Sequence, residues 1–155
     1  MNASNQTDPA ASERSLADVA RAFYEPFRTG DTSTYATVLA DNWVDIPLAP
    51  GQEQGPAGMP DQIAGFRYVM PDYTVIHEDV LVSGDRVTVR NTVTGTHQGA
   101  FMGHEPTGRR IEMRTIDIHE IRDGRIVTTW HLEDFAGLLA QLSAPADAPV
   151  LPAWS

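Results

Sequence analysis

The chain of 155 residues lacks cysteine, long apolar runs and any concentrated basic segment. Without cysteine it can form no disulfide, thiolate metal site or cysteine nucleophile, which fits a cytoplasmic protein. No stretch of about 18 apolar residues is present, so we expect no membrane-spanning helix. The net charge of -10 repels phosphate backbones and anionic membranes, and Arg109-Arg110 is the single adjacent basic pair. We therefore expect neither nucleic acid nor a membrane as a partner.

Motifs typical of metal, nucleotide and serine-hydrolase sites are also missing. The histidines show no His-x-x-x-His or Glu-x-x-His spacing. No Gly-rich phosphate loop and no G-x-S-x-G motif occurs. A few side chains, among them His97, His119 and His131, could supply metal ligands in principle. The spacing nevertheless predicts no metal site and no other cofactor.

The length and composition fit one globular domain, with 41% hydrophobic and 21% charged residues. Residues 1–14 are polar and contain no apolar stretch, so we expect a disordered leader and not a signal peptide. We place the folded domain at residues 15–142. Residues 143–155 are rich in proline and alanine and are predicted to be an irregular tail.

Helical patterns fill the first half of the chain, and strand patterns follow from residue 73. We expect the first helix to start near Ser15 and to kink or end at Pro26. Gly30 should stop it, and Asp31 should cap a second helix. A third helix, segments rich in valine and threonine, and a short last helix capped by Asp134 complete the pattern. This order predicts an α+β fold in which about three N-terminal helices enclose a pocket against a curved antiparallel sheet.

The last predicted hairpin joins residues 109–121 to residues 125–132, and its turn decides which side chains share a face. A three-residue loop would pair Ile121 with Arg125 and make Asp117 and His131 diagonal neighbours on one face. A two-residue loop would move His131 to the opposite face. We favour the three-residue loop.

Under this register one face of the hairpin is polar and the other is apolar. The polar face carries Thr115, Asp117, His119, Thr129 and His131. From alternation alone, the more common arrangement is a polar face in solvent, and a polar-lined cavity is the less common one.

Four segments carry a resemblance to a known family. They read "FYEPFRTGD", "ADNWVDIP", "TGTHQGAFMGHEPTGRR" and "IHEIRDGRIVTTWHLEDFAGLLAQL". From about residue 16 to 142 the chain resembles the SnoaL-like polyketide cyclases, in the ketosteroid-isomerase-like superfamily. The resemblance implies a cone-shaped domain with a deep, mostly apolar pocket, but the superfamily hosts many unrelated activities.

The resemblance also implies roles for particular residues. In the cyclases an aspartate on the last strand acts as acid/base in an intramolecular aldol closure, helped by a histidine on the preceding strand. The matching positions here hold His131 and Asp117, so the pair is present with its types exchanged. The base of the ketosteroid isomerases falls near Asp45, and their hydrogen-bonding tyrosine matches Phe23, with Tyr24 one position out of phase. Steroid isomerisation is therefore not expected.

His131 is the leading catalytic candidate because an unperturbed histidine pKa of about 6.5 suits proton transfer near neutral pH. Asp117 could fix its tautomer, or could stay protonated and donate to a developing oxyanion. The pair could close a ring by an aldol or an epoxide-opening step on a hydrophobic small molecule. Epoxide hydrolysis or hydration and non-catalytic ligand binding are the alternatives. A sheet face left exposed would indicate a homodimer.

The remaining candidates each have a plainer explanation. Asp45 is a third pocket carboxylate or the end of a turn. The expected substrate-binding residues could instead be packing residues, loop residues or one member of a surface ion pair; they are Phe23, Trp43, Arg90, His97 and His119.

Overall fold

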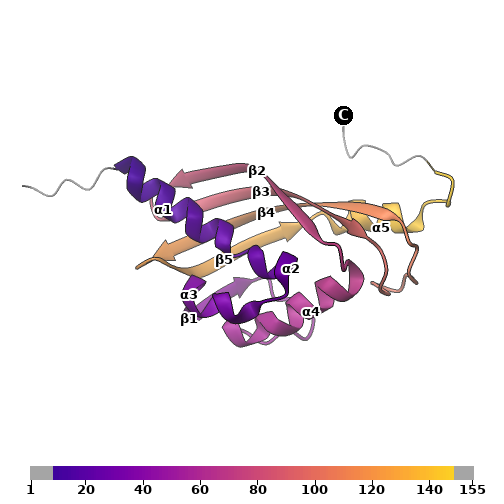
Figure 1. Ribbon diagram of the computed structural model, residues 1–155, viewed down its shortest axis with the longest axis horizontal. Coiled ribbons are helices and arrows are strands. Elements are labelled where there is room, and N and C mark those ends of the chain that lie inside the picture. Colours follow the sequence, from indigo (N-terminus) through magenta and orange to yellow (C-terminus); the bar gives the residue numbers. More distant parts are fainter. Residues whose placement is uncertain (1–8, 149–155) are drawn as a thin grey trace, which may run out of the picture.

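The computed structural model describes residues 9–148, which form one five-stranded sheet with helices on one side (Figure 1). The helices are α1 (Pro9–Ala22), α2 (Glu25–Thr29), α3 (Tyr35–Val38), α4 (Met59–Val69) and α5 (Phe135–Ser143), with 3-10 turns at Thr32–Thr34 and Pro56–Gly58. The strands are β1 (Leu39–Ile46), β2 (Thr74–Ser83), β3 (Arg86–Thr96), β4 (Arg110–Arg122) and β5 (Arg125–Glu133). The α+β class is confirmed. None of the helices described is long and apolar enough to cross a membrane.

The first helix starts earlier than the sequence pattern suggested. It begins at Pro9, and we expected a start near Ser15. Proline is favoured at a helix start because its missing N–H needs no partner there. Residues 9–14 of the predicted leader are therefore helical. The rest of that leader, and residues 149–155 of the predicted tail, lie outside the described residues.

Pro26 breaks the N-terminal helix, as predicted. Its ring nitrogen has no hydrogen to donate to the carbonyl of Ala22, and α1 ends at Ala22. A short turn at Phe23 and Tyr24 precedes α2, which Gly30 ends in the left-handed conformation. Asp31 then caps the following 3-10 turn by accepting a hydrogen bond from the Ser33 N–H. The break brings two consecutive aromatic residues into the core.

The strands lie in the order β1-β5-β4-β3-β2. β2 to β5 form an antiparallel meander, and β1 joins the edge parallel to β5. The parallel edge strand corrects our expectation of an antiparallel sheet. Because β1 pairs with β5, Asp45 lies beside the last strand.

The β4–β5 turn differs from the favoured prediction. Asp123 and Gly124, both with positive φ, form a two-residue loop, and Arg122 pairs with Arg125. A bulge then shifts the register by one residue, because Ile121 pairs with Ile126 whereas Glu120 pairs with Thr128. The bulge returns His131 to the face of Asp117, directly opposite it.

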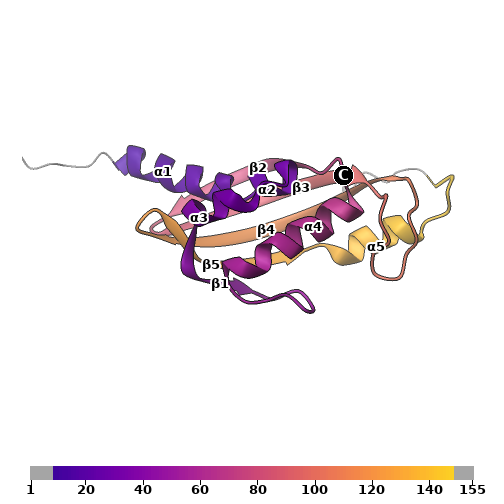
Figure 2. The same ribbon diagram turned by 60° about the horizontal axis from the view of Figure 1, so that its bottom comes forward.

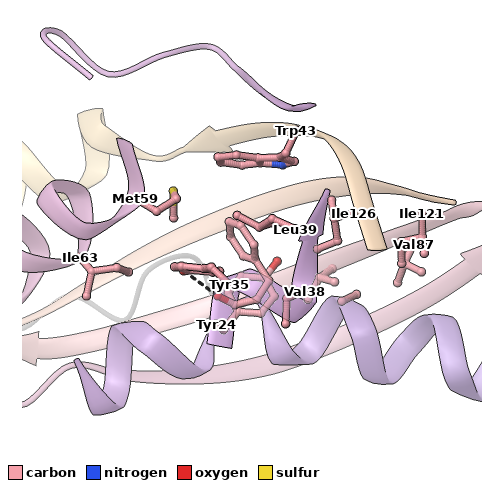
Figure 3. Close-up of a cluster of buried hydrophobic side chains, with 13 residues drawn as sticks. Tyr24, Tyr35, Val38, Leu39, Trp43, Met59, Ile63, Val87, Ile121 and Ile126 are labelled. Carbon is pink, nitrogen blue, oxygen red and sulfur yellow. Dashed lines mark hydrogen bonds between the residues drawn. The ribbon is translucent and has the colours of Figure 1, made fainter. Parts of the chain in front are cut away.

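Two apolar clusters form the core. The first lies between the helices α1, α3 and α4 and the sheet, and contains Trp43, Leu39, Tyr35 and Ile63 (Figure 3). The second joins the end of α4 to α5 and includes Met70, Tyr73, Met113 and Leu138. Helices α2 and α4 lie over the middle of the sheet, and α1 and α5 lie toward its opposite ends (Figure 2). The space left between the clusters forms the candidate site.

Candidate active site

A cavity of about 570 Å³ lies between the two clusters. Most of its wall is apolar or aromatic, with side chains from the helices, from the sheet and from the loop after β3; they include Phe23, Phe27, Met59, Phe66, Tyr73, Val93, Phe101, Met113, Phe135 and Leu138. A wall of this kind suits a hydrophobic small molecule.

The polar face of the β4–β5 hairpin belongs to the inside of the molecule. Thr115, Asp117 and Thr129 line the cavity and are buried, and His119 lies buried behind them. On the apolar face, Ile116 is 51% and Leu132 is 74% exposed. The more common arrangement, with the polar face in solvent, is therefore wrong here, because this face surrounds a hollow with groups that need partners.

Asp117 presents one carboxylate oxygen to the protein and the other to the cavity. Its Oδ2 accepts hydrogen bonds from the Tyr24 hydroxyl at 2.7 Å, the Asn91 amide at 2.9 Å and the Thr115 hydroxyl at 3.2 Å. Within residues 15–148, Oδ1 has no hydrogen-bond partner, and it is not completely buried. Any proton that Asp117 exchanges is therefore carried on Oδ1.

A directional chain of hydrogen bonds leads to Oδ2 from the buried side. The Trp43 indole N–H donates to Thr129 Oγ1 at 3.0 Å, so the single Thr129 hydroxyl hydrogen is free for His119 Nδ1, also at 3.0 Å. His119 then carries its proton on Nε2 and donates to the Tyr24 hydroxyl at 3.0 Å. Tyr24 in turn donates to Asp117. The directions follow from Asp117, whose carboxylate can only accept. Tyr24 donates its one hydroxyl hydrogen there and must accept from His119 Nε2, which leaves Nδ1 of the neutral ring to accept from Thr129.

A second set of contacts holds Asp117 from the side of β3. Asn91 is buried, and its amide nitrogen donates to both Asp117 and Thr115. Its carbonyl oxygen accepts from His77 Nδ1 at 2.6 Å. The Asp117 carboxylate is therefore fixed in orientation by neutral groups on three elements.

Burial dominates the protonation of the groups around this carboxylate. It raises the pKa of Asp117 to about 6, against the lowering effect of the Tyr24 hydrogen bond, and the charge of Glu133 raises it further. Burial lowers the pKa of His119 to about 3, so its imidazole is neutral. Asp117 is poised to gain and lose a proton near neutral pH.

His131 is placed to be a cation. Its Nδ1 lies 2.7 Å from Glu133 Oε1, and its Nε2 lies 2.9 Å from the Pro47 carbonyl and 3.3 Å from Asp45 Oδ1. Burial lowers the pKa of His131, but hydrogen bonds to Asp45 and Glu133, with their charges, outweigh burial and raise it to about 10. An imidazolium is an acid and not a base at neutral pH, so these partners oppose the base role that the sequence favoured.

Two residues of the site were not among the sequence candidates. Glu133 lies two residues after His131 on the same face of β5, one position beyond the predicted end of this strand at Leu132. Tyr24 appeared one position out of phase with the family tyrosine. The helix break before Pro26 is what turns both Phe23 and Tyr24 inward.

The structure brings together some of the predicted site residues and separates others. Asp45, Asp117, His131 and Phe23 line the cavity. Trp43 and His119 lie behind its wall as members of the hydrogen-bond chain, which corrects their predicted substrate contact.

Two further predictions fail on position. His97 is fully buried outside the cavity wall, where its Nδ1 accepts from the Thr107 N–H at 3.2 Å. Arg90 lies on the outer face, half exposed, in an ion pair with Asp79 at 2.6 Å. Arg90 is thus half of a cross-strand surface pair, the plainer explanation of its position. His97 is neither a pocket residue nor an exposed loop residue, because it is buried against the loop that contains Thr107.

A metal-like cluster also lies in the cavity. One ligand atom each from Asp117, His131 and Glu133 lie within 4.8 Å of one another. A histidine ligand must be neutral and must turn a free nitrogen to the metal. Both nitrogens of His131 face oxygen acceptors, and its pKa is raised, so the arrangement fits an ion-pair cluster better than a metal site.

Comparisons with known proteins identify the family. The sequence model of the SnoaL-like polyketide cyclases matches residues 17–142. The chain belongs to this family. No curated protein sequence in the comparison matches it.

Solved structures of the SnoaL-like fold agree with this assignment. TsrD from Streptomyces laurentii is 28% identical, covers 90% of this chain and 100% of its own, and superposes with a TM-score of 0.76. A proposed polyketide cyclase from Bacillus cereus is 33% identical over 87% of this chain and 86% of its own, with a TM-score of 0.74. IdmH from Streptomyces antibioticus, also a proposed polyketide cyclase, is 32% identical over 83% of this chain and 99% of its own, with a TM-score of 0.73.

Proposed function

We propose that this SnoaL-like protein is a cofactor-independent acid/base cyclase or isomerase for a hydrophobic small molecule. One observation carries the proposal: the free oxygen of a buried carboxylate and a histidine cation share an apolar cavity. A scaffold domain would fill this space with apolar side chains. The family and its proposed cyclases support a cyclase, and polyketide-like compounds are the substrate class that they suggest.

The proposed roles follow from the geometry. Asp117 Oδ1 removes a proton next to a substrate carbonyl, while Oδ2 stays bound to its three donors. Negative charge moves from Asp117 to the carbonyl oxygen, where the His131 cation stabilises it after one N–H exchanges its present acceptor for that oxygen. The enolate carbon then attacks a second carbonyl of the same molecule, and the new alkoxide takes the proton back.

Asp45 and Glu133 have supporting roles in this scheme. Both lie beside the imidazole, at 3.3 and 2.7 Å, and keep it protonated between reaction cycles. They assist an acid that would be neutral in an apolar cavity without them.

The two groups could also open an epoxide, with Asp117 deprotonating an internal hydroxyl or a water molecule and His131 protonating the epoxide oxygen. A water nucleophile would make the enzyme an epoxide hydrolase. Turnover of styrene oxide to its diol would favour that second reaction class over carbonyl chemistry.

The proposal is tested with 2-tetralone, an apolar ketone with exchangeable protons next to its carbonyl. In D2O the protein should accelerate deuterium incorporation, measured by proton NMR. Asp117→Asn should reduce this acceleration by about two to four orders of magnitude, because a general base contributes that much. Exchange that Asp117→Asn leaves unchanged would refute the base role, provided that circular dichroism shows the variant folded.

We also propose that the protein is a homodimer formed through the outer sheet face. Four large apolar residues on this face are 41% to 74% exposed: Ile46, Ile76, Ile116 and Leu132. They border one groove that runs over all five strands and also holds charged side chains. Exposed apolar residues gathered among polar ones mark an interaction surface more often than a free surface.

A further inference from the structure

The acidic side chains of the cavity outnumber its cations. Asp45, Asp61, Asp117 and Glu133 line it, and His131 is its one cationic group among the described residues. The chain has eleven arginines and no lysine, and none of the arginines whose side chains the structure describes lines the cavity. The hollow therefore carries net negative charge inside a protein whose formal charge is already -10.

The partners of these carboxylates leave the negative charge uncompensated. His131 is shared between Asp45 and Glu133, so one positive charge serves two carboxylates. Asp45 has one more partner, the neutral amide of Gln52 at 2.8 Å. Asp117 receives its hydrogen bonds from neutral donors alone.

Asp117 points the uncompensated charge into the cavity. It is 5% exposed, and its Oδ1 lacks a hydrogen-bond partner within the part of the chain that the structure describes. A Glu133 oxygen lies within 4.8 Å of an Asp117 oxygen, and the charge of Glu133 adds to the burial that raises the pKa of Asp117. A buried carboxylate of this kind gains most from a positive partner.

From this placement we infer that the cavity selects a substrate that bears a basic nitrogen, protonated at neutral pH, on an apolar ring system, and that it rejects carboxylates. The inference rests on the proposed function, since it names the substrate class of the same site. The cation would lie nearest Glu133, close enough to be attracted by Asp117 while Asp117 Oδ1 stays available for the proposed proton transfer. The aromatic side chains of Phe23, Phe27 and Tyr73 on the cavity wall would favour a cation over a neutral group of the same shape.

The test compares three probes that share one ring system: 2-naphthylmethylamine, 2-naphthylmethanol and 2-naphthoate. Calorimetric titration of the full chain at pH 7.5 should give the tightest binding for the amine. We expect the amine to bind at least tenfold more tightly than the alcohol, and the carboxylate to bind most weakly. Equal affinities, or preference for the carboxylate, would overturn the inference.

Two variants separate a local effect from the overall charge of the protein. Glu133→Gln keeps an acceptor for His131 but removes one charge, and it should reduce the advantage of the amine over the alcohol at least threefold. Asp41→Asn makes the same change in net charge on a fully exposed side chain outside the cavity and should leave the advantage unchanged. Equal reductions in both variants would show non-specific attraction and overturn the inference.

Divalent ions are the other source of positive charge. Titration with MgCl2 and ZnCl2 should show no site that competes with the amine. Tight, competitive metal binding would assign the negative charge to a metal and refute an amine substrate. Deuterium exchange of 2-tetralone remains an independent test, so a neutral ketone that exchanges well without any amine preference would leave the proposed function intact.

Discussion

On the β4–β5 hairpin the polar face lies inside the molecule and the apolar face lies outside. This is the reverse of what the polarity of the two faces suggests. Asp117, Thr129 and His131 face the cavity, whereas Ile116 and Leu132 face outward. The inner polar groups are stable there because they bond to one another and to Tyr24 and Asn91. The comparison shows that strand alternation identifies two faces but does not tell which face contacts water.

After Asp117→Asn, the largest effect in this comparison is expected for His131→Gln. Glutamine keeps a polar side chain but removes the cation between Asp45 and Glu133. We expect exchange of 2-tetralone to fall about a hundredfold, because the oxyanion loses its charged partner. The matched outer-face change at the next residue, Leu132→Gln, should leave exchange within about twofold of wild type.

His131→Gln should also change how the free energy of unfolding depends on pH. The folded-state pKa of about 10 lies above the unfolded value of about 6.5. The stabilisation by His131 is therefore fully present below pH 6.5 and is lost as the pH rises through 10. Denaturant unfolding of wild type and His131→Gln should differ clearly at pH 6 and much less at pH 10.5. An equal difference at both values would show that the imidazole is not charged in the fold.

A smaller effect is expected when the buried hydrogen-bond chain is interrupted. Thr129→Val removes the acceptor of the Trp43 N–H and the donor to His119, leaving buried polar atoms unpaired. The free energy of unfolding should fall by about 2 kcal/mol. Exchange should slow about tenfold, and its pH midpoint should rise because Tyr24 holds Asp117 less firmly.

Two controls show whether Thr129 acts through its hydroxyl. Thr129→Ser restores the hydroxyl and should restore both the rate and the pH midpoint. Thr128→Val makes the same chemical change on the opposite face of β5 and should alter neither. A midpoint that stays at the wild-type value in Thr129→Val would show that the chain stabilises the fold without positioning Asp117.

The smallest effect on catalysis is expected on the outer face. Ile116→Arg places a charge in the centre of the exposed apolar groove and should convert a dimer to a monomer, as measured by sedimentation velocity. Exchange activity per chain should remain within about threefold, since the cavity is built from one chain. A wild-type protein that sediments as a monomer would refute the proposed dimer.

Much of the fold could be predicted because it depends on local signals. Pro26, Gly30 and Asp134 act as the sequence indicated, and the valine- and threonine-rich segments are strands. Asp117 and His131 lie on one face of the hairpin, as predicted, although the predicted turn was wrong. The two-residue loop alone would have separated them, and the bulge after Ile126 cancels its effect. That bulge has no signature in the residues themselves, so spacing could not reveal it.

The chemistry of the site was less accessible to prediction because protonation depends on contacts between distant segments. Asp45 reaches His131 only because β1 joins the sheet parallel to β5. The role of His119 depends on its burial below Tyr24, which is 95 residues away in sequence. Family resemblance pointed to Asp117 and His131 as candidates, but only these contacts indicate which of the two carries the proton at neutral pH.

The most direct test is a titration of the histidine side chains by nitrogen-15 NMR between pH 5 and 9, with His131→Gln used to assign the His131 signals. Both ring nitrogens of His131 should keep the chemical shifts of an imidazolium across this range, while His119 remains neutral throughout. A His131 signal that titrates near pH 6.5 would contradict the acid role and would return the function of base to the imidazole.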